Sequence, residues 1–194
     1  DNYIDAEDSK KISFFDDLTL IELVVKSGIS TVINNFPQQV RKNNGTVAEV
    51  IDANVRKLIT EEKDNDPVLY KKMSKLLNEI ILDRRKGALD YEAYLKKIAK
   101  LCKKIQDQFS DSEYPLDINS KPRMALYNNL ENDEKLAIKL DEAIIKNKPD
   151  GWKGVRIKEE MVKMIIEEAL KQENIENKEL VEKILKLAIE QKEY

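Results

Sequence analysis

Apolar residues recur along most of this chain at intervals of three and four positions, which is the spacing of one face of an α-helix. The clearest case follows Asp66 and Pro67, a pair typical of a helix cap and a first-turn proline. The apolar positions of this segment are Leu69, Met73, Leu76, Leu77, Ile80 and Ile81. Gly87 stands where a glycine commonly ends a helix. The pattern predicts a long helix between Asp66 and Gly87.

A second long helix is predicted directly after this one. Asp90 is placed to cap it, and residues 87–89 are the whole connection between the two helices. Its apolar positions are Tyr91, Tyr94, Leu95, Ile98, Leu101, Cys102 and Ile105. Such a short connection makes neighbouring helices antiparallel, so we expect a helical hairpin over residues 66–108.

Shorter helices are predicted on both sides of the hairpin. Ahead of it, one helix covers residues 18–26 with Gly28 beyond its end, and another starts at a capping box formed by Thr46 and Glu49. Residues 29–45 between them are predicted to be irregular, with one helical turn. The helices expected after the hairpin cover residues 123–130, 134–146, 157–171 and 178–191. No useful stretch alternates apolar and polar positions, so we predict no β-sheet.

Two prolines, at 115 and 122, interrupt the helical pattern and mark an internal boundary. The predicted organisation is a lead-in, a helical domain with the hairpin, a linker and a C-terminal helical subdomain, covering residues 1–17, 18–108, 109–121 and 122–194. The predicted fold class is all-α, an irregular multi-helix bundle with one long antiparallel hairpin. The chain starts at Asp1 rather than methionine, so we expect a piece of a longer polypeptide, although processing would give the same start.

Composition supports the helices and narrows the chemistry. Charged residues make up 37% of the 194 positions, and only five glycines and five prolines occur. The chain has no histidine, which removes the commonest general base and a common metal ligand. A single cysteine cannot form an internal disulfide, and no apolar run reaches the roughly 18 to 20 residues that span a bilayer. We therefore expect a cytoplasmic protein without a membrane segment.

The residues that remain do not form a recognisable catalytic arrangement. No glycines have the spacing of a phosphate-binding loop. Cys102 lies on an apolar stripe, which favours a small core residue over a nucleophile. The glutamate pairs 159–160 and 167–168 alternate with lysines, which favours a solvated face over a metal site. We predict that this fragment is not an enzyme and binds no cofactor or metal.

Charge suggests candidate binding residues. The net charge is −3, but residues 41–108 hold sixteen Lys and Arg against eleven Asp and Glu. The candidates for interface or phosphate contacts are Arg84, Arg85, Lys86, Trp152 and Arg156. The three cations at 84–86 either complement a helix C-terminus or contact phosphate. Trp152 is either an anchor between helices or an exposed residue that binds a partner.

Several blocks of the sequence resemble the helical C-terminal region of the R (motor) subunits of type I restriction enzymes. They follow the family's order and cover most of the chain from about residue 14. The blocks are NVRKLI at 54–59, MSKLL at 73–77, RRKGALDYEAYL at 84–95, ALYNNL at 125–130, and DGWKG at 150–154 followed by IKE at 157–159 and VKMI at 162–165. The last helix, from residue 178, resembles the family least.

This resemblance implies a function that composition does not show. A complete R subunit contains a nuclease domain and two ATP-hydrolysing motor domains, for which ATP and Mg are expected, and the parent enzyme is an ATP-dependent type I site-specific deoxyribonuclease. None of those motifs lies in this segment. The resemblance implies that this tail docks the DNA-translocating subunit onto the methyltransferase core, with the methyltransferase and specificity subunits as partners. The alternative is a DNA-contacting helical arm, or a small helical nucleic-acid-binding protein.

Overall fold

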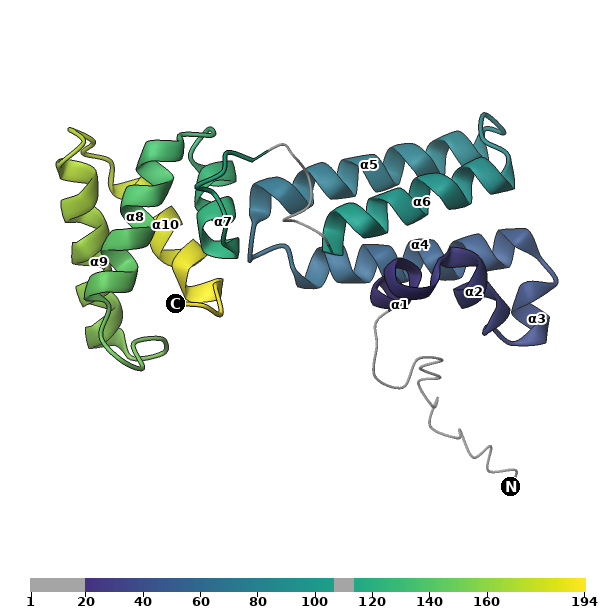
Figure 1. Ribbon diagram of the computed structural model, residues 1–194, viewed down its shortest axis with the longest axis horizontal. Coiled ribbons are helices and arrows are strands. Elements are labelled where there is room, and N and C mark those ends of the chain that lie inside the picture. The colour runs from purple at the N-terminus through teal and green to yellow at the C-terminus, as the bar shows by residue number, and fades with distance from the viewer. Residues whose placement is uncertain (1–19, 107–113) are drawn as a thin grey trace, which may run out of the picture.

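The computed structural model describes residues 20–106 and 114–194, and within them the chain is all-helical, with ten α-helices and no strand (Figure 1). The predicted all-α fold class is confirmed. The predicted lead-in at residues 1–17 lies outside the described residues, as does part of the predicted linker. The helices are α1 (Leu20–Ser27), α2 (Ile29–Asn34), α3 (Gln38–Arg41), α4 (Asn44–Glu61), α5 (Pro67–Arg85), α6 (Tyr91–Gln106), α7 (Lys121–Asn129), α8 (Glu134–Asn147), α9 (Arg156–Lys171) and α10 (Lys178–Glu190).

Four helices of the N-terminal half surround one hydrophobic core. Helix α1 packs against α4 and α6, while α5 packs against α4 and α6, so the four helices form a ring. The side chains of Ile51, Leu77 and Ile98 are fully buried at its centre. Helices α5 and α6 lie side by side along their length, as the short connection predicted (Figure 1). We call this half the N-terminal bundle, residues 20–106.

The predicted caps of the hairpin are present. Asp66 caps α5, and its Oδ1 accepts a hydrogen bond from Leu69 N at 3.1 Å. Asp90 Oδ1 accepts one from Ala93 N at 2.7 Å in the first turn of α6. Gly87 follows the end of α5 with φ of 73°, a left-handed conformation that glycine adopts without steric cost. Local side-chain chemistry therefore sets these helix ends.

The prediction was wrong about the residue that caps α4, and the segment before α4 is more helical than predicted. Asn43, rather than Thr46, caps α4, because Asn43 Oδ1 accepts hydrogen bonds from Gly45 N at 2.8 Å and Thr46 N at 3.1 Å. This segment was predicted to be irregular with one helical turn before Pro37; it contains two short helices, α2 before Pro37 and α3 after it. Val32 and Phe36 from this segment are buried in the core, so tertiary packing stabilises turns that are too short to form alone.

The C-terminal half forms a second ring around a separate core. Helix α8 packs against α7 and α9, and α10 packs against α9 and α7. This C-terminal bundle begins before α7, since Ile118 N donates to Pro115 O at 3.0 Å and the resulting turn buries Ile118 in the second core. The predicted linker at residues 109–121 therefore included residues that belong to this bundle, which we define as residues 114–194.

Polar groups join the two bundles where the start of α5 meets α7 and α10. The buried Asp66 carboxylate accepts hydrogen bonds from Asn128 Nδ2 at 2.7 Å and Asn129 Nδ2 at 2.9 Å. Gln191 Nε2 donates to Asn65 O at 2.7 Å. Burial raises the pKa of Asp66 above its usual value, although these hydrogen bonds oppose the shift. The same aspartate thus caps α5 and holds the second bundle.

We expect the hairpin of α5 and α6 to fail when its apolar stripe receives a charge. Leu77→Asp places a carboxylate where the side chain is 1% exposed, and should lower the free energy of unfolding by about 3 to 5 kcal/mol. Leu82→Asp is the matched control, because Leu82 lies on the same helix and is 50% exposed; its effect should stay within about 0.5 kcal/mol. Urea unfolding followed by circular dichroism measures both. Equal effects of the two substitutions would contradict this burial pattern.

Candidate functional site

Arg84, a predicted phosphate contact, is occupied by a contact inside the N-terminal bundle. Its Nη2 lies 3.1 Å from Asp52 Oδ2, and its guanidinium lies 5.1 Å from the centre of the Tyr94 ring. The Tyr94 hydroxyl donates to Asp52 Oδ1 at 2.7 Å, and burial raises the pKa of Tyr94 well above its usual value. Arg84 thus neutralises a buried carboxylate and links the end of α5 to α4, a role that neither alternative of the sequence analysis included.

Arg85 and Lys86 remain exposed next to it. Arg85 lies in the last turn of α5 and Lys86 is the C-cap, where cations favour the carbonyl end of a helix. The structure therefore separates the three predicted cations, since Arg84 faces the core and the other two face solvent.

The C-terminal bundle repeats the arrangement of carboxylate, arginine and tyrosine. Arg123 Nε lies 2.6 Å from Asp141 Oδ2, and the Tyr194 hydroxyl donates to Asp141 Oδ1 at 2.7 Å. Asp141 is itself buried. Neither Asp52 nor Asp141 was predicted from the sequence to be a buried ion-pair partner, although the sequence contains a signal for both. Each takes one position of an otherwise apolar stripe, 48–51–52–55 in α4 and 137–140–141–144 in α8.

Trp152, a candidate interface residue, is an internal anchor. Its side chain is 1% exposed, and its Nε1 donates to Tyr194 O at 3.1 Å. The ring thus holds the loop between α8 and α9 against Tyr194, which agrees with the first of the two predicted alternatives, an anchor between helices. Arg156, the last candidate, is exposed at the first position of α9. The predicted candidates therefore do not come together at one site.

The residues that were considered for catalysis or metal binding have structural roles. Cys102 is fully buried, and burial raises the pKa of its thiol to about 12, so the reactive thiolate is disfavoured near neutral pH. Glu159 Oε1 accepts a hydrogen bond from Gly154 N at 2.8 Å, which holds the loop before α9. Among residues 20–106 and 114–194, no three or more His, Cys, Asp or Glu side chains are grouped so that they could hold a metal ion. No helix in those same ranges is long and apolar enough to cross a membrane.

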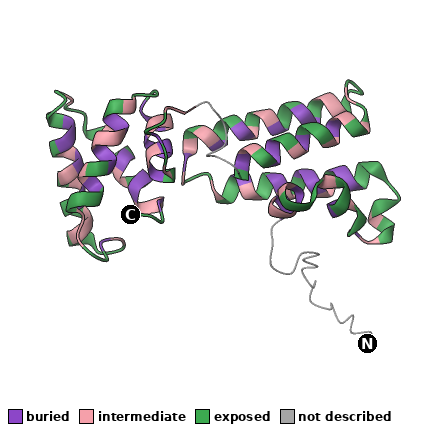
Figure 2. Cartoon of the chain, viewed as in Figure 1, coloured by how far each residue is buried: buried purple, intermediate pink, exposed green. Residues whose placement is uncertain are grey.

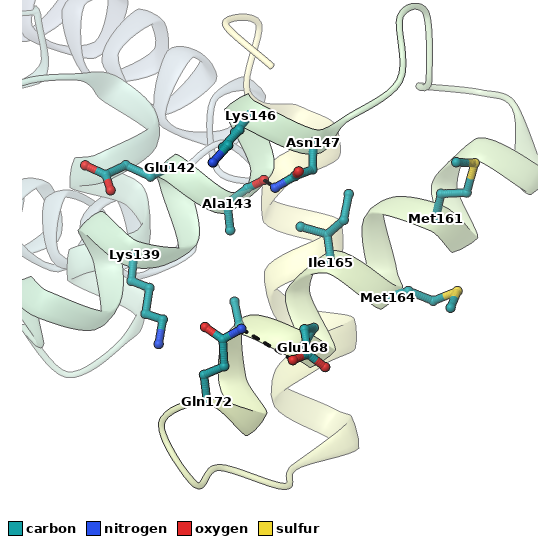
Figure 3. A pocket seen from close by; sticks show the side chains of 11 residues that line it. Lys139, Glu142, Ala143, Lys146, Asn147, Met161, Met164, Ile165, Glu168 and Gln172 are labelled. Atoms are coloured by element: carbon teal, nitrogen blue, oxygen red, sulfur yellow. Dashed lines mark hydrogen bonds between the residues drawn. The ribbon is translucent and has the colours of Figure 1, made fainter.

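A groove lies between α8 and α9 in the C-terminal bundle. It has a volume of about 650 Å³ and is lined by residues of both helices (Figure 3). Its residues are Lys139, Glu142, Ala143, Lys146 and Asn147 from α8, and Met161, Met164, Ile165, Glu168, Ala169 and Gln172 from α9. Ile165 points from α9 toward α8, whereas Met161 and Met164 extend from the outer side of α9 (Figure 3). The groove therefore combines apolar side chains with charged ones.

Most of the exposed large apolar side chains lie on the two helices that form this groove, or at the start of α9. Of the eight large hydrophobic residues exposed in the described part of the chain, five lie on α8, on α9 or at the start of α9. They are Ile145, Val155, Ile157, Met161 and Met164. Ile157 is 78% exposed and Met164 is 66% exposed, and α9 lies at the end of the molecule opposite the N-terminal bundle (Figures 1 and 2). Contact between the bundles therefore does not account for this apolar surface. Exposed apolar surface that repeats along one helix, as at Ile157, Met161 and Met164, is suited to binding another protein.

Comparison of the chain with protein-family models, with curated proteins and with solved structures gives no match. The candidate site is therefore defined by the groove and by the exposed apolar residues of α9. It is the groove with the exposed side of α9, which we call the α9 surface and define by Ile157, Met161, Met164 and Ile165.

The two neighbouring arginines at the end of α5 give a sharp test of the buried ion pair. Arg84→Ala leaves the Asp52 carboxylate without its cation, and we expect the free energy of unfolding to fall by about 3 kcal/mol. This value is near the lower end for a broken buried ion pair, because both side chains keep some exposure. Arg85→Ala removes an exposed arginine and should change stability by less than about 0.5 kcal/mol. Thermal unfolding of both variants measures the difference. Similar midpoints for the two would show that the pair does not stabilise the bundle.

Proposed function

We propose that this chain is the C-terminal assembly module of a type I restriction enzyme R subunit. In this role it docks the ATP-dependent, DNA-translocating and DNA-cleaving subunit onto the methyltransferase core. The partners are the methyltransferase and specificity subunits of the same enzyme. The module itself performs no catalysis, and its task is to hold the motor in position while DNA is moved.

The observation that carries this proposal is the exposed apolar α9 surface beside a groove. Ile157, Met161 and Met164 follow one another at intervals of four and three residues, so they lie on one side of α9. Apolar side chains that are left open on a bundle whose own core is complete are suited to burial against another protein. The resemblance of the sequence blocks quoted above to R subunits supports the proposed identity of that protein, and the exposed apolar surface supports the proposed mode of binding.

Assembly with purified subunits tests the proposal. The 194-residue chain should elute with the methyltransferase and specificity subunits in size-exclusion chromatography, and a variant ending at residue 113 should not. The truncation point follows the structure, because Ile118 belongs to the second core. The N-terminal bundle has its own core, so circular dichroism of the shortened chain should keep its helical signal and serve as the control. Co-elution that survives the truncation would place docking outside the C-terminal bundle.

One observation favours the second candidate, a DNA-contacting arm. Lys96, Lys100 and Lys103 are all exposed and are spaced four and three residues apart, so they line one side of α6. Rows of lysine are suited to phosphate contacts, although they carry no information about base sequence. The surrounding α5 and α6 surfaces also carry acidic residues, such as Glu79 and Glu92, which weaken the attraction.

Salt dependence separates the two candidates. Under the assembly proposal, we expect weak binding to a fluorescent DNA duplex, changed less than about threefold by the double variant Lys100→Glu and Lys103→Glu. Lys178→Glu, an exposed lysine of the C-terminal bundle, is the control. Tight binding that falls steeply between about 50 and 200 mM salt, and that the double variant alone abolishes, would favour the DNA arm.

A further inference from the structure

We propose that the groove between α8 and α9 binds an amphipathic helix of the partner protein, about three turns long. Acidic residues of this helix would lie along its edge facing α8, and basic residues along the opposite edge. This inference rests on the assembly function proposed above and names the structure and charge pattern of what is docked.

The shape of the groove fits a helix. Its lining residues recur on α8 at 139, 142–143 and 146–147, and on α9 at 161, 164–165, 168–169 and 172. The lining residues on each wall therefore recur at helical spacing along the length of the groove. The α9 wall covers eleven residue steps, or about 16 Å at 1.5 Å per residue, which is the length of about three helical turns. Two packed helices with an open seam present the ridges into which a third helix can pack.

The groove residues favour apolar contact of low shape specificity. Ala143 and Ala169 are small and allow close approach of another helix, and Ile165 adds a branched apolar side chain to the lining. Met161 and Met164 add flexible, polarisable side chains that adapt to the surface they meet. Ile157 continues this apolar line one turn beyond the groove.

The two sides of the groove differ in charge. On the α8 side, Lys139 lies 2.6 Å from Glu173 and Glu142 lies 3.6 Å from Arg123, so both are in ion pairs, and Lys146 is exposed. On the far side of α9, Glu160 and Glu167 stand four and three residues from Met164, so all three share one side of the helix. Both glutamates act on Lys163, which is already paired with Glu182 of α10. The side of α9 that carries Glu160 and Glu167 thus keeps a surplus of negative charge. On the α8 side, Lys146 is available for an acidic residue of the bound helix.

This charge pattern selects among occupants. A helix with one acidic edge and one basic edge can place its acidic edge beside Lys146 and its basic edge beside Glu160 and Glu167. For a given helix, only one of its two directions along the groove gives this placement. A helix with both signs mixed along each edge meets like charges on both sides. Burial of apolar side chains therefore provides the affinity for a helix. The charges at the two edges of the groove distinguish a helix with segregated charges from one with mixed charges.

The test uses two synthetic helical peptides of fourteen residues with the same composition and the same leucine stripe. One has its glutamates on one edge and its lysines on the other, and the second has both residue types mixed on each edge. Fluorescence anisotropy with the full 194-residue chain should show the segregated peptide binding at least about threefold more tightly, as a few exposed ion pairs allow.

Variants of the chain locate the binding. Met164→Asp should weaken the segregated peptide by about tenfold or more, since it places a charge on the α9 surface without entering the core. Lys146→Glu should remove the preference between the peptides. Leu82→Asp, which changes an exposed leucine of α5, should leave binding unchanged and is the matched control.

Three outcomes would overturn the proposal: equal binding of both peptides, binding that Met164→Asp does not weaken, or no binding of either peptide. A concentration-dependent dimer in sedimentation velocity that Met164→Asp abolishes would also overturn it, because a second copy of the chain would then be the occupant. These results differ from failure of the assembly function. If Met164→Asp still assembles with the methyltransferase and specificity subunits, the groove proposal fails alone; if the unaltered chain does not assemble with them, the assembly function fails.

Discussion

Each long helix of this chain has one apolar face, and the fold depends on covering that face with the faces of other helices. No single pair completes the burial, so each half of the chain closes a ring of four: α1, α4, α5 and α6 in one, and α7 to α10 in the other. Helices of this length are marginal in water when isolated. The long helices are therefore stable only when the ring of four is closed. The short helices α2 and α3 are stable because Val32 and Phe36 are buried against the first ring.

A buried carboxylate constrains each ring further. Asp52 and Asp141 each contact one arginine and one tyrosine that come from other parts of the same bundle. Removing a carboxylate from water is costly unless charged and hydrogen-bonding partners replace the solvent. A packing that moves one of these helices by a residue leaves a buried charge unpaired. These contacts thus favour one register of the helices, in addition to the burial of apolar surface.

The two bundles differ in what they leave on their surfaces. The N-terminal bundle carries exposed lysines along α6, whereas the C-terminal bundle exposes isoleucine and methionine along α9. Their joint is polar and centred on Asp66, and the apolar end of the C-terminal bundle points away from it. A module of this form can present its apolar end to a partner while the rest of its surface stays hydrated. That division of surfaces is the physical basis of the assembly proposal.

The sequence by itself determined the elements with strong local signals. Asp66 with Pro67 set the start of α5, Asp90 set the start of α6, and the apolar spacing identified Leu77 and Ile98 as core residues, because caps and helical periodicity depend only on near neighbours in the chain. Local patterns did not separate Arg84 from Arg85, since the distinction depends on Asp52, thirty-two residues away. They also did not decide whether Trp152 is buried or reveal the groove between α8 and α9. Those features were decided by the tertiary structure, because burial and concave surface arise only when helices distant in sequence pack together.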